Sequence, residues 1–304
     1  MTARIVTFLT GPELSRSAYS RETQIATVSE EGFFRQHVEP FLTETECSLQ
    51  LGTDVAVNVD RGSDTRWPKV EFLTKEGGGV IALLYPEATT EHTYWVLQQL
   101  WDAGLSSPEK HQVPEPLDWL ADLNVVLTRS YLDQPLAPFI LQGGKEAEAA
   151  VREAARWLLR LHSASVRVGE QLAHDPWRMF FELSHGLSAA AARYPQEIPQ
   201  LTWMLGRVRA LAKYRKNVPA VQGHGQFQPE NLFRSRDNLV ATGFEGSLPA
   251  DPSHDLATFV HWLQIKARDG DSTGEFADKL SRAFLDEYRT QQPLRSGNLA
   301  YYWC

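Results

Sequence analysis

The sequence contains few cysteines and no long apolar run. Its two cysteines, Cys47 and Cys304, lie far apart and have no companion at metal-ligand spacing. The sequence therefore predicts free thiols and neither a disulfide framework nor a zinc site. No apolar stretch approaches the roughly 18 residues that a membrane helix needs, and the apolar stretch at residues 5–9 is too short for a secretory signal. These absences predict a cytoplasmic protein.

The sequence also has fewer basic than acidic residues. The chain has 30 Lys and Arg against 38 Asp and Glu, which gives a net charge of -8 and a pI near 5.6. This balance argues against a nucleic-acid partner, because neutralising phosphates requires a basic surface. It is compatible with a cationic ligand. The 304 residues, 42% of them apolar, suit one large domain or two smaller ones with a substantial core.

The first half of the chain has the pattern of a small antiparallel sheet. Short segments rich in β-branched and aromatic residues predict strands, with a glycine turn at 77–79 before the last of them: 48–51, 55–59, 69–73 and 80–85. Helical spacing at 89–103 predicts a helix capped by Thr89 or Thr90 and stopped by Gly104. A proline-containing stretch at 113–120 and a strand at 124–132 follow.

The second half has helical periodicity. After Gly143-Gly144, an apolar stripe that begins at Ala147 predicts a long helix ending near His162. Further helices are expected at 175–194, 197–213, 254–267 and 274–289. A strand and loop insert interrupts them at 218–248. The predicted organisation is α+β, with an N-terminal helical extension at 1–47, a sheet lobe at 48–136 and a mostly helical lobe at 137–304.

Two segments carry a specific pattern. VQGHGQFQPENLF at 221–233 precedes LVATGFEGSLPADPSHDLATF at 239–259, so that two short apolar strands flank a polar loop and the second leads into Asp-Pro and a helix. This pattern resembles the catalytic core of the aminoglycoside phosphotransferase and choline kinase-like family. The resemblance implies a bilobal protein kinase-like fold. The retained positions of the family loops include His224, Asn231, Glu245, Asp251 and Asp255.

Three positions depart from the family pattern. Gln226 occupies the place of the catalytic-base aspartate, and Gly243 the place of the aspartate that holds magnesium. In VIALLYPE, Leu83 stands where the family has a lysine that contacts the nucleotide phosphates. An amide is too weak a base to accept a hydroxyl proton, and glycine and leucine supply neither a metal ligand nor a cation. The resemblance and these departures together predict no catalytic residues, no metal site, and weak or absent Mg-ATP binding.

The retained residues have simpler interpretations. His224 and Asp255 suit bracing and capping of the loop, and Asn231 suits a loop amide better than a metal ligand. Glu91, on the predicted helix at 89–103, is either the remnant of a lysine partner or a surface residue. Lys69 lies on the strand before Leu83 and is a candidate to replace the missing lysine.

Two main hypotheses follow. The first is a pseudokinase that acts by binding an unknown small-molecule ligand or protein partner, as a scaffold, regulator or sensor, with no nucleic acid or membrane involved. The alternative is an active ATP-dependent small-molecule phosphotransferase with relocated catalytic groups, such as Lys69 with Glu245 or Asp251. A third hypothesis is an obligate subunit of another protein, including a genuine kinase of the same family.

Overall fold

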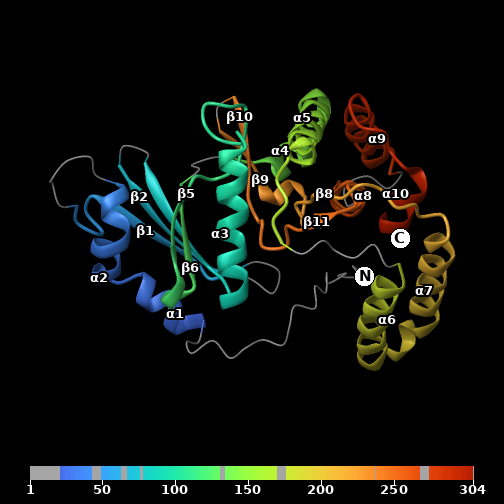
Figure 1. The fold of residues 1–304 in the computed structure, drawn as a ribbon, viewed down its shortest axis with the longest axis horizontal. Coiled ribbons are helices and arrows are strands. Elements are labelled where there is room, and N and C mark those ends of the chain that lie inside the picture. The colour runs from blue at the N-terminus through green and yellow to red at the C-terminus, as the bar shows by residue number, and fades with distance from the viewer. Residues whose placement is uncertain are drawn as a thin grey trace. The chain divides into compact units, whose positions relative to one another are not determined.

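The computed structural model describes residues 21–42, 49–62, 67–75, 78–130, 134–169, 176–235, 237–267 and 274–303, and Figure 1 shows its ribbon. Cys47 and Cys304 lie outside these residues. The described chain divides into two compact units. The sheet unit comprises residues 21–134 and 233–245, and the helical unit comprises residues 135–232 and 246–303. The α+β fold with an antiparallel sheet and a mostly helical part is confirmed.

The sheet unit is built on a five-stranded antiparallel sheet in the order β1-β2-β3-β6-β5. Its strands are β1 (Val55–Asp60), β2 (Lys69–Thr74), β3 (Gly79–Leu84), β5 (Pro116–Leu120) and β6 (Val125–Arg129). Four of these cover segments with the predicted strand pattern. The strand predicted at 48–51 is wrong over its described residues, where only an isolated bridge joins Leu51 to Val55. β5 forms within the proline-containing stretch instead.

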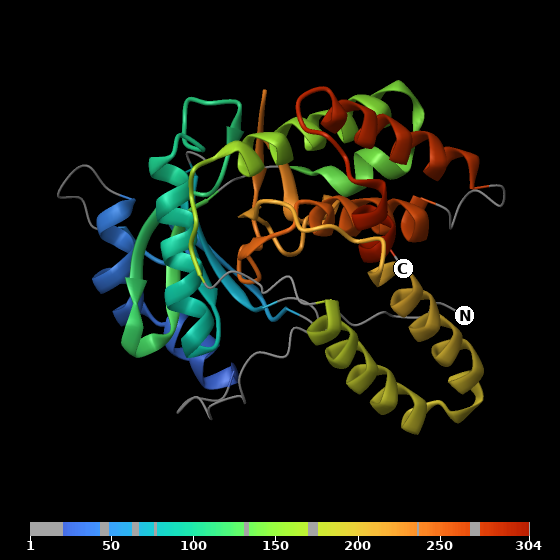
Figure 2. The same ribbon diagram turned by 45° about the vertical axis from the view of Figure 1, so that its right-hand side comes forward.

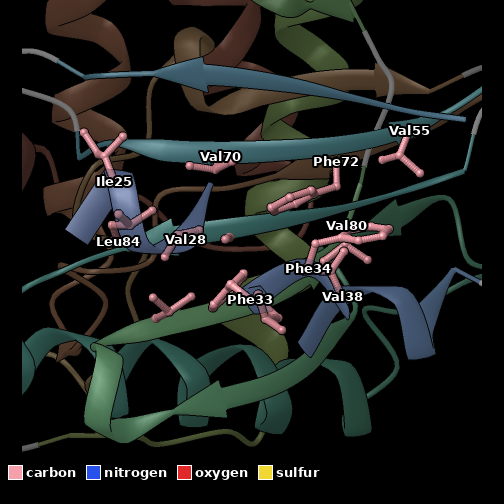
Figure 3. Packing of buried hydrophobic residues seen from close by; sticks show 13 residues of the cluster. Ile25, Val28, Phe33, Phe34, Val38, Val55, Val70, Phe72, Val80 and Leu84 are labelled. Atoms are coloured by element: carbon pink, nitrogen blue, oxygen red, sulfur yellow. The ribbon is translucent and has the colours of Figure 1, made fainter. Parts of the chain in front are cut away.

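One face of this sheet is covered by N-terminal helices. Alternate residues of β2 and β3 point to that face, because strand side chains alternate between faces. Figure 3 shows Val70, Phe72, Val80 and Leu84 meeting apolar side chains of the helices. The helical segments are α1 (Arg21–Val28), α2 (Glu31–Phe33), a π-helix at Phe34–Val38 and a 3-10 turn at Glu39–Phe41. Phe34 stacks on Phe72 with ring centroids 5.9 Å apart, so this segment is part of the core.

Helix α3 (Glu87–Asp102) packs on β5 and β6. It begins two residues before Thr89, and its N-cap is Pro86. The hydroxyls of Thr90 and Thr93 do not cap the helix, because each donates to the backbone carbonyl four residues earlier. The predicted capping role of Thr89 or Thr90 is therefore wrong. The helix ends where predicted, since Gly104 follows with a φ of 88° that favours glycine.

The helical unit contains seven α-helices among the described residues. They are α4 (Leu136–Gln142), α5 (Gly144–Ser163), α6 (Pro176–Arg193), α7 (Ile198–Ala212), α8 (Ser253–Trp262), α9 (Glu275–Arg289) and α10 (Ser296–Trp303). A 3-10 turn at Pro195–Glu197 joins α6 to α7, and a π-helix at Leu263–Ala267 extends α8. Helix α5 packs along α9, and α6 and α7 form the antiparallel hairpin seen in Figure 2. No helix among the described residues is long and apolar enough to cross a membrane.

Short strands lie between α7 and α8 in sequence. β8 (Val221–Gln222) pairs antiparallel with β11 (Pro249–Ala250). β9 (Leu232–Ser235) and β10 (Asn238–Ala241) belong to a second sheet in the order β4-β10-β9-β7, with β4 at His111–Gln112 and β7 at Gln134–Pro135. These strands hold the ends of the polar loops that the sequence singled out.

Candidate functional site

The pairing of β8 with β11 brings two polar loops together. Val221 lies opposite Ala250 and Gln222 opposite Pro249, so the loop that follows β8 begins beside the residues that precede β11, and the N–H of Gly223 donates to the carbonyl of Leu248 over 2.9 Å. His224 and Gln226 follow β8, and Asp251 and Asp255 follow β11. The first loop continues through a 3-10 turn at Pro229–Asn231 into β9. The helical unit therefore gathers most of the retained family residues in one place.

Asp255 lies at the centre of this arrangement. It is 1% exposed, in the first turn of α8. The backbone N–H of His224 donates to Oδ2 over 2.7 Å, and that of Gly225 donates to Oδ1 over 2.9 Å. Nε2 of His162 lies 3.0 Å from Oδ2. One carboxylate thus fixes the start of the loop to α5 and α8.

These contacts explain the ionisation of Asp255. Burial alone would raise its pKa, because a charged group is poorly solvated inside a protein. Hydrogen bonds and positive charge from His162 and His254 outweigh that effect and hold the pKa of Asp255 far below its usual range. Asp255 is therefore a stable carboxylate that serves as an anchor and not as a proton acceptor.

The anchor continues to α9. Nδ1 of His162 lies 2.7 Å from the hydroxyl of Tyr288, and both side chains are buried. Burial, followed by the negative charges of Asp255 and Asp251, raises the pKa of Tyr288. The sequence placed His162 only at the end of a predicted helix and did not single out Tyr288. The position of His162 in the last turn of an apolar helix was the one available signal.

His224 and Asn231 brace the loop. The imidazole of His224 is buried against Trp157 and Phe227, with ring centroids 6.2 and 5.5 Å away. Its Nδ1 accepts from the backbone N–H of Gln226 over 3.3 Å. Nδ2 of Asn231 donates to the carbonyl of Gln226 over 2.9 Å. The backbone of Gln226 is thus held from both sides, which supports the loop-amide interpretation of Asn231.

Gly225 is required by the geometry of this loop. Its φ is 86°, a region that side chains other than glycine rarely adopt. A Cβ atom at this position would lie 2.1 Å from the carbonyl oxygen of Gly246, which is far inside van der Waals contact. The two polar loops touch here through backbone atoms alone.

Asp251 joins the second loop to the C-terminal helix. It is 2% exposed, and its Oδ1 accepts from the backbone N–H of Ser253 over 2.9 Å. Nδ2 of Asn298, on α10, donates to Oδ2 over 2.6 Å, and Nε of Arg215 lies 3.8 Å from the same oxygen. Sequence reasoning singled out neither Asn298 nor Arg215, because the contact spans 47 residues and follows no local pattern.

In the sheet unit, Leu83 lies directly opposite Lys69 of β2 and Val126 of β6. Leu83 is half-buried, and its correspondence to the family's lysine stays a prediction. Nζ of Lys69 lies 2.6 Å from Oε1 of Glu71, and both side chains are 24% exposed. Glu91 is exposed on α3, which favours the surface interpretation of that residue.

Gly243 and Glu245 follow β10. Gly243 has a φ of 81° and provides no ligand atom from a side chain. Glu245 is partly exposed, yet its Oε2 is buried and has no hydrogen-bond partner among the described residues. Burial raises the pKa of the Glu245 carboxyl above its ordinary value, and a single backbone hydrogen bond opposes the effect.

The candidate positions are divided between the two units. Leu83 and Gly243 belong to the sheet unit, and Gln226 and Asn231 belong to the helical unit. That these four residues bound a common space stays a prediction. Among the described residues, no group of three or more His, Cys, Asp or Glu side chains is placed to hold a metal ion.

Comparison with known families agrees with this arrangement. The model of the phosphotransferase enzyme family matches residues 69–294, about three quarters of the chain. The chain belongs to this family. The matched region contains both polar loops and β3, and it ends just before α10. The resemblance drawn from the His224 and Asp255 segments is confirmed.

Solved structures of family members share the fold. A choline/ethanolamine kinase family protein from Mesorhizobium loti is 14% identical, with a TM-score of 0.58 over 92% of this chain and 80% of that one. The aminoglycoside phosphotransferase APH(2'')-Ib, solved with ADP, is 15% identical, with a TM-score of 0.58 over 82% and 81%. The choline kinase LicA from Streptococcus pneumoniae is 16% identical, with a TM-score of 0.54 over 82% and 81%. No curated protein sequence matches the chain.

Proposed function

We propose that this member of the phosphotransferase family does not transfer phosphate with magnesium and ATP, and instead acts by binding a small molecule or a protein. One observation carries the proposal. The backbone of Gln226 is held by hydrogen bonds to His224 and Asn231, yet its side chain, at the position where the family pattern has a catalytic base, is an amide. The scaffold is kept while the reactive group is absent.

The chemistry of phosphoryl transfer explains why this matters. Catalysis depends on positioning and on neutralising the charge of the transferred group. Gln226 cannot accept a proton near neutral pH, and loss of a general base alone costs about 100- to 10,000-fold in rate. Leu83 and Gly243 remove a cation and a metal ligand. Losses of groups that act together are not additive, but each of these three removes a different contribution.

The residues present do not fit a magnesium site of the family type. Gly243 has no side-chain oxygen, and the Nδ2 of Asn231 is committed to the carbonyl of Gln226. The amide oxygen of Asn231 is neutral, whereas magnesium bound to a nucleotide is usually held by carboxylates. Magnesium-assisted catalysis is therefore not part of the proposed function.

Thermal unfolding with and without nucleotide tests the proposal. A ligand at about 100 times its dissociation constant raises the free energy of unfolding by about 2.7 kcal/mol. We expect no change in Tm when the wild-type protein is mixed with millimolar MgATP. A magnesium-dependent rise in Tm together with ATP turnover at about 1 per second or faster, an ordinary kinase rate, would contradict the proposal.

A reversion variant sharpens this test. We expect L83K/Q226D/G243D to gain magnesium-dependent nucleotide binding. The control L83K/Q226N/G243N has side chains of the same shape without the carboxylates, and it should gain none. Aspartate and asparagine are among the residues that best tolerate the positive φ at position 243, so both variants carry a similar strain of about 1 kcal/mol.

Lys69 supports a second candidate function, an active phosphotransferase with a relocated lysine. It lies directly opposite Leu83 on the adjacent strand, and paired residues of adjacent strands point to the same face. Lys69→Ala and Lys75→Ala form a matched pair, since Lys75 lies just beyond the end of the same strand. A MgATP-induced rise in Tm that Lys69→Ala abolishes and Lys75→Ala preserves would favour this function over the first.

A further inference from the structure

Helices α7 and α10 enclose two cavities in the helical unit. One, of about 560 Å³, lies between the C-terminal end of α7 and the start of α10, and Leu211, Tyr214 and Leu294 contribute its apolar surface. The other, of about 250 Å³, is lined by Trp203, Met204 and Arg207 of α7 and by Trp303. Because α10 starts beside Tyr214 and ends beside Trp203, the helices run antiparallel and the cavities follow one line between them. We call this line the α7–α10 groove.

Large apolar side chains of the groove are exposed. Trp203 is 66% exposed, Tyr214 is 59% exposed and Trp303 is 50% exposed. Tyr214 lies two residues beyond the end of α7 and eleven residues after Trp203, which places the two side chains about 16 Å apart at about 1.5 Å per residue. Exposed aromatic side chains that line cavities in this way are typical of interaction surfaces.

The charge of the groove is opposite to that of the chain. Residues 198–216 and 294–303 contain six Lys and Arg and no Asp or Glu, so the rest of the chain carries a net charge of -8 - 6 = -14. Arg215 turns inward to Asp251, and the other five are exposed. They are Arg207, Arg209, Lys213, Lys216 and Arg295. No carboxylate of the described residues forms an ion pair with any of these five side chains, and none lines either cavity.

We propose that the α7–α10 groove binds an acidic amphipathic helix of a partner protein. Its apolar side would contact Trp203, Tyr214 and Trp303, and its carboxylates would pair with Arg207, Lys216 and Arg295. The length of the groove corresponds to about three turns of a helix at about 5.4 Å per turn. The proposal holds whether or not the protein transfers phosphate, because none of these residues is a retained or altered family position.

The shape and charge of the groove select this occupant. A membrane surface requires a convex apolar patch, whereas these side chains line cavities between two helices. A basic partner would be repelled by these five exposed cations. An acidic helix satisfies both the apolar and the charged side chains, which is how specific interfaces combine an aromatic centre with a charged rim.

The test uses the full-length protein and a designed, fluorescently labelled peptide of 16 residues. Its helix presents Leu and Phe at every third or fourth position, with Glu and Asp on the flanking positions. We expect saturable binding by fluorescence anisotropy that weakens as salt is raised. The same peptide with Lys in place of every Glu and Asp should bind at least about tenfold more weakly, because like charges then face each other.

Variants of the protein locate the site. We expect R207E/K216E/R295E to raise the Kd of the acidic peptide by at least about tenfold, and W203A to raise it by about tenfold as the loss of an aromatic contact. The matched controls are R209E, which lies on α7 outside both cavities, and W95A, an exposed tryptophan of α3 in the sheet unit. Both should bind like the wild type.

Three outcomes would overturn the proposal. The first is absence of peptide binding, or equal binding by R207E/K216E/R295E and the wild type. The second is binding of vesicles of phosphatidylserine and phosphatidylcholine by the wild type but not by W203A, with no competition from the peptide. This result would assign the groove to a membrane. The third is a dimer in sedimentation velocity that dissociates in R207E/K216E/R295E, which assigns the groove to a second copy of the chain.

Discussion

Asp255 is the residue on which the loop around Gln226 most depends. Its two oxygens receive three donors from two separate segments, and the contacts with His162 and His224 are fully buried. No other side chain can receive the same three donors without a rearrangement of the loop. Asp255 therefore stabilises the conformation of the loop, and this role is independent of any catalysis by the loop.

Asp255→Asn tests this role. The amide places an NH₂ group against donors that now need an acceptor, so at least one buried donor loses its partner. We expect the free energy of unfolding to fall by about 3 kcal/mol, which is typical of a broken buried ion pair. Urea unfolding at pH 7 measures the change. Asp237→Asn, an exposed position in the turn between β9 and β10, should have no effect, and an equal loss in both variants would contradict the prediction.

Glu245 should lower the stability of the protein at neutral pH. Its pKa is raised in the folded state, so the unfolded chain ionises more easily and stability falls as pH rises through and above about 4.5. Glu245→Gln stays uncharged and should be more stable than the wild type at pH 7 by about 1 kcal/mol. At pH 4 the difference should disappear. The prediction would be contradicted if Glu245→Gln were less stable than the wild type at pH 7. It would also be contradicted if Glu109→Gln, at an exposed position, had an equal effect.

At the level of elements, periodicity located most of the structure. The strands at 55–60, 69–74 and 79–84 and helices α5, α6, α7 and α9 lie within a few residues of their predicted ranges. β5 was not predicted, because Pro116 at its start obscured the pattern. Helix α10 was not predicted either, since its eight residues, SGNLAYYW, are too few to establish a helical period.

The candidate site was predictable only in part. The sequence located both polar loops through ordered motifs, since motif spacing is a local property. The roles of His162, Tyr288, Asn298 and Arg215 arise from contacts across 36 to 126 residues, as in the pairs Arg215–Asp251 and His162–Tyr288. Such contacts depend on tertiary packing, and no local pattern in a single sequence encodes them.

One side chain of helix α10 makes three hydrogen bonds to the segments beside it. Asn298 accepts from the backbone N–H of Lys216 over 2.8 Å, donates to the carbonyl of the same residue over 2.8 Å, and also donates to Asp251. We expect Asn298→Ala to lower the free energy of unfolding by about 2 to 3 kcal/mol and to speed hydrogen exchange in residues 296–303. Asn217→Ala, at an exposed neighbouring position, is the control. Unchanged protection of α10 in Asn298→Ala would contradict this role.

For the whole molecule, the two carboxylates predict a pH profile with opposite slopes. The depressed pKa of Asp255 contributes stability that is complete above about pH 4 and is lost as pH falls, because the unfolded chain is protonated first. We expect the difference in unfolding free energy between wild type and Asp255→Asn to shrink steadily below pH 4. Urea unfolding from pH 3 to pH 8 measures it. A difference that stays constant over that range would show that the carboxylate charge is not what stabilises the loop.

The two units are interleaved along the chain. The hairpin at residues 233–245 belongs to the sheet unit, although helical segments precede and follow it, and Leu239 of β10 pairs with His111 of β4. During translation, β4 therefore has to wait for more than a hundred further residues before its partner strand leaves the ribosome. Each unit is therefore encoded by separate stretches of the gene, with a stretch for the other unit between them.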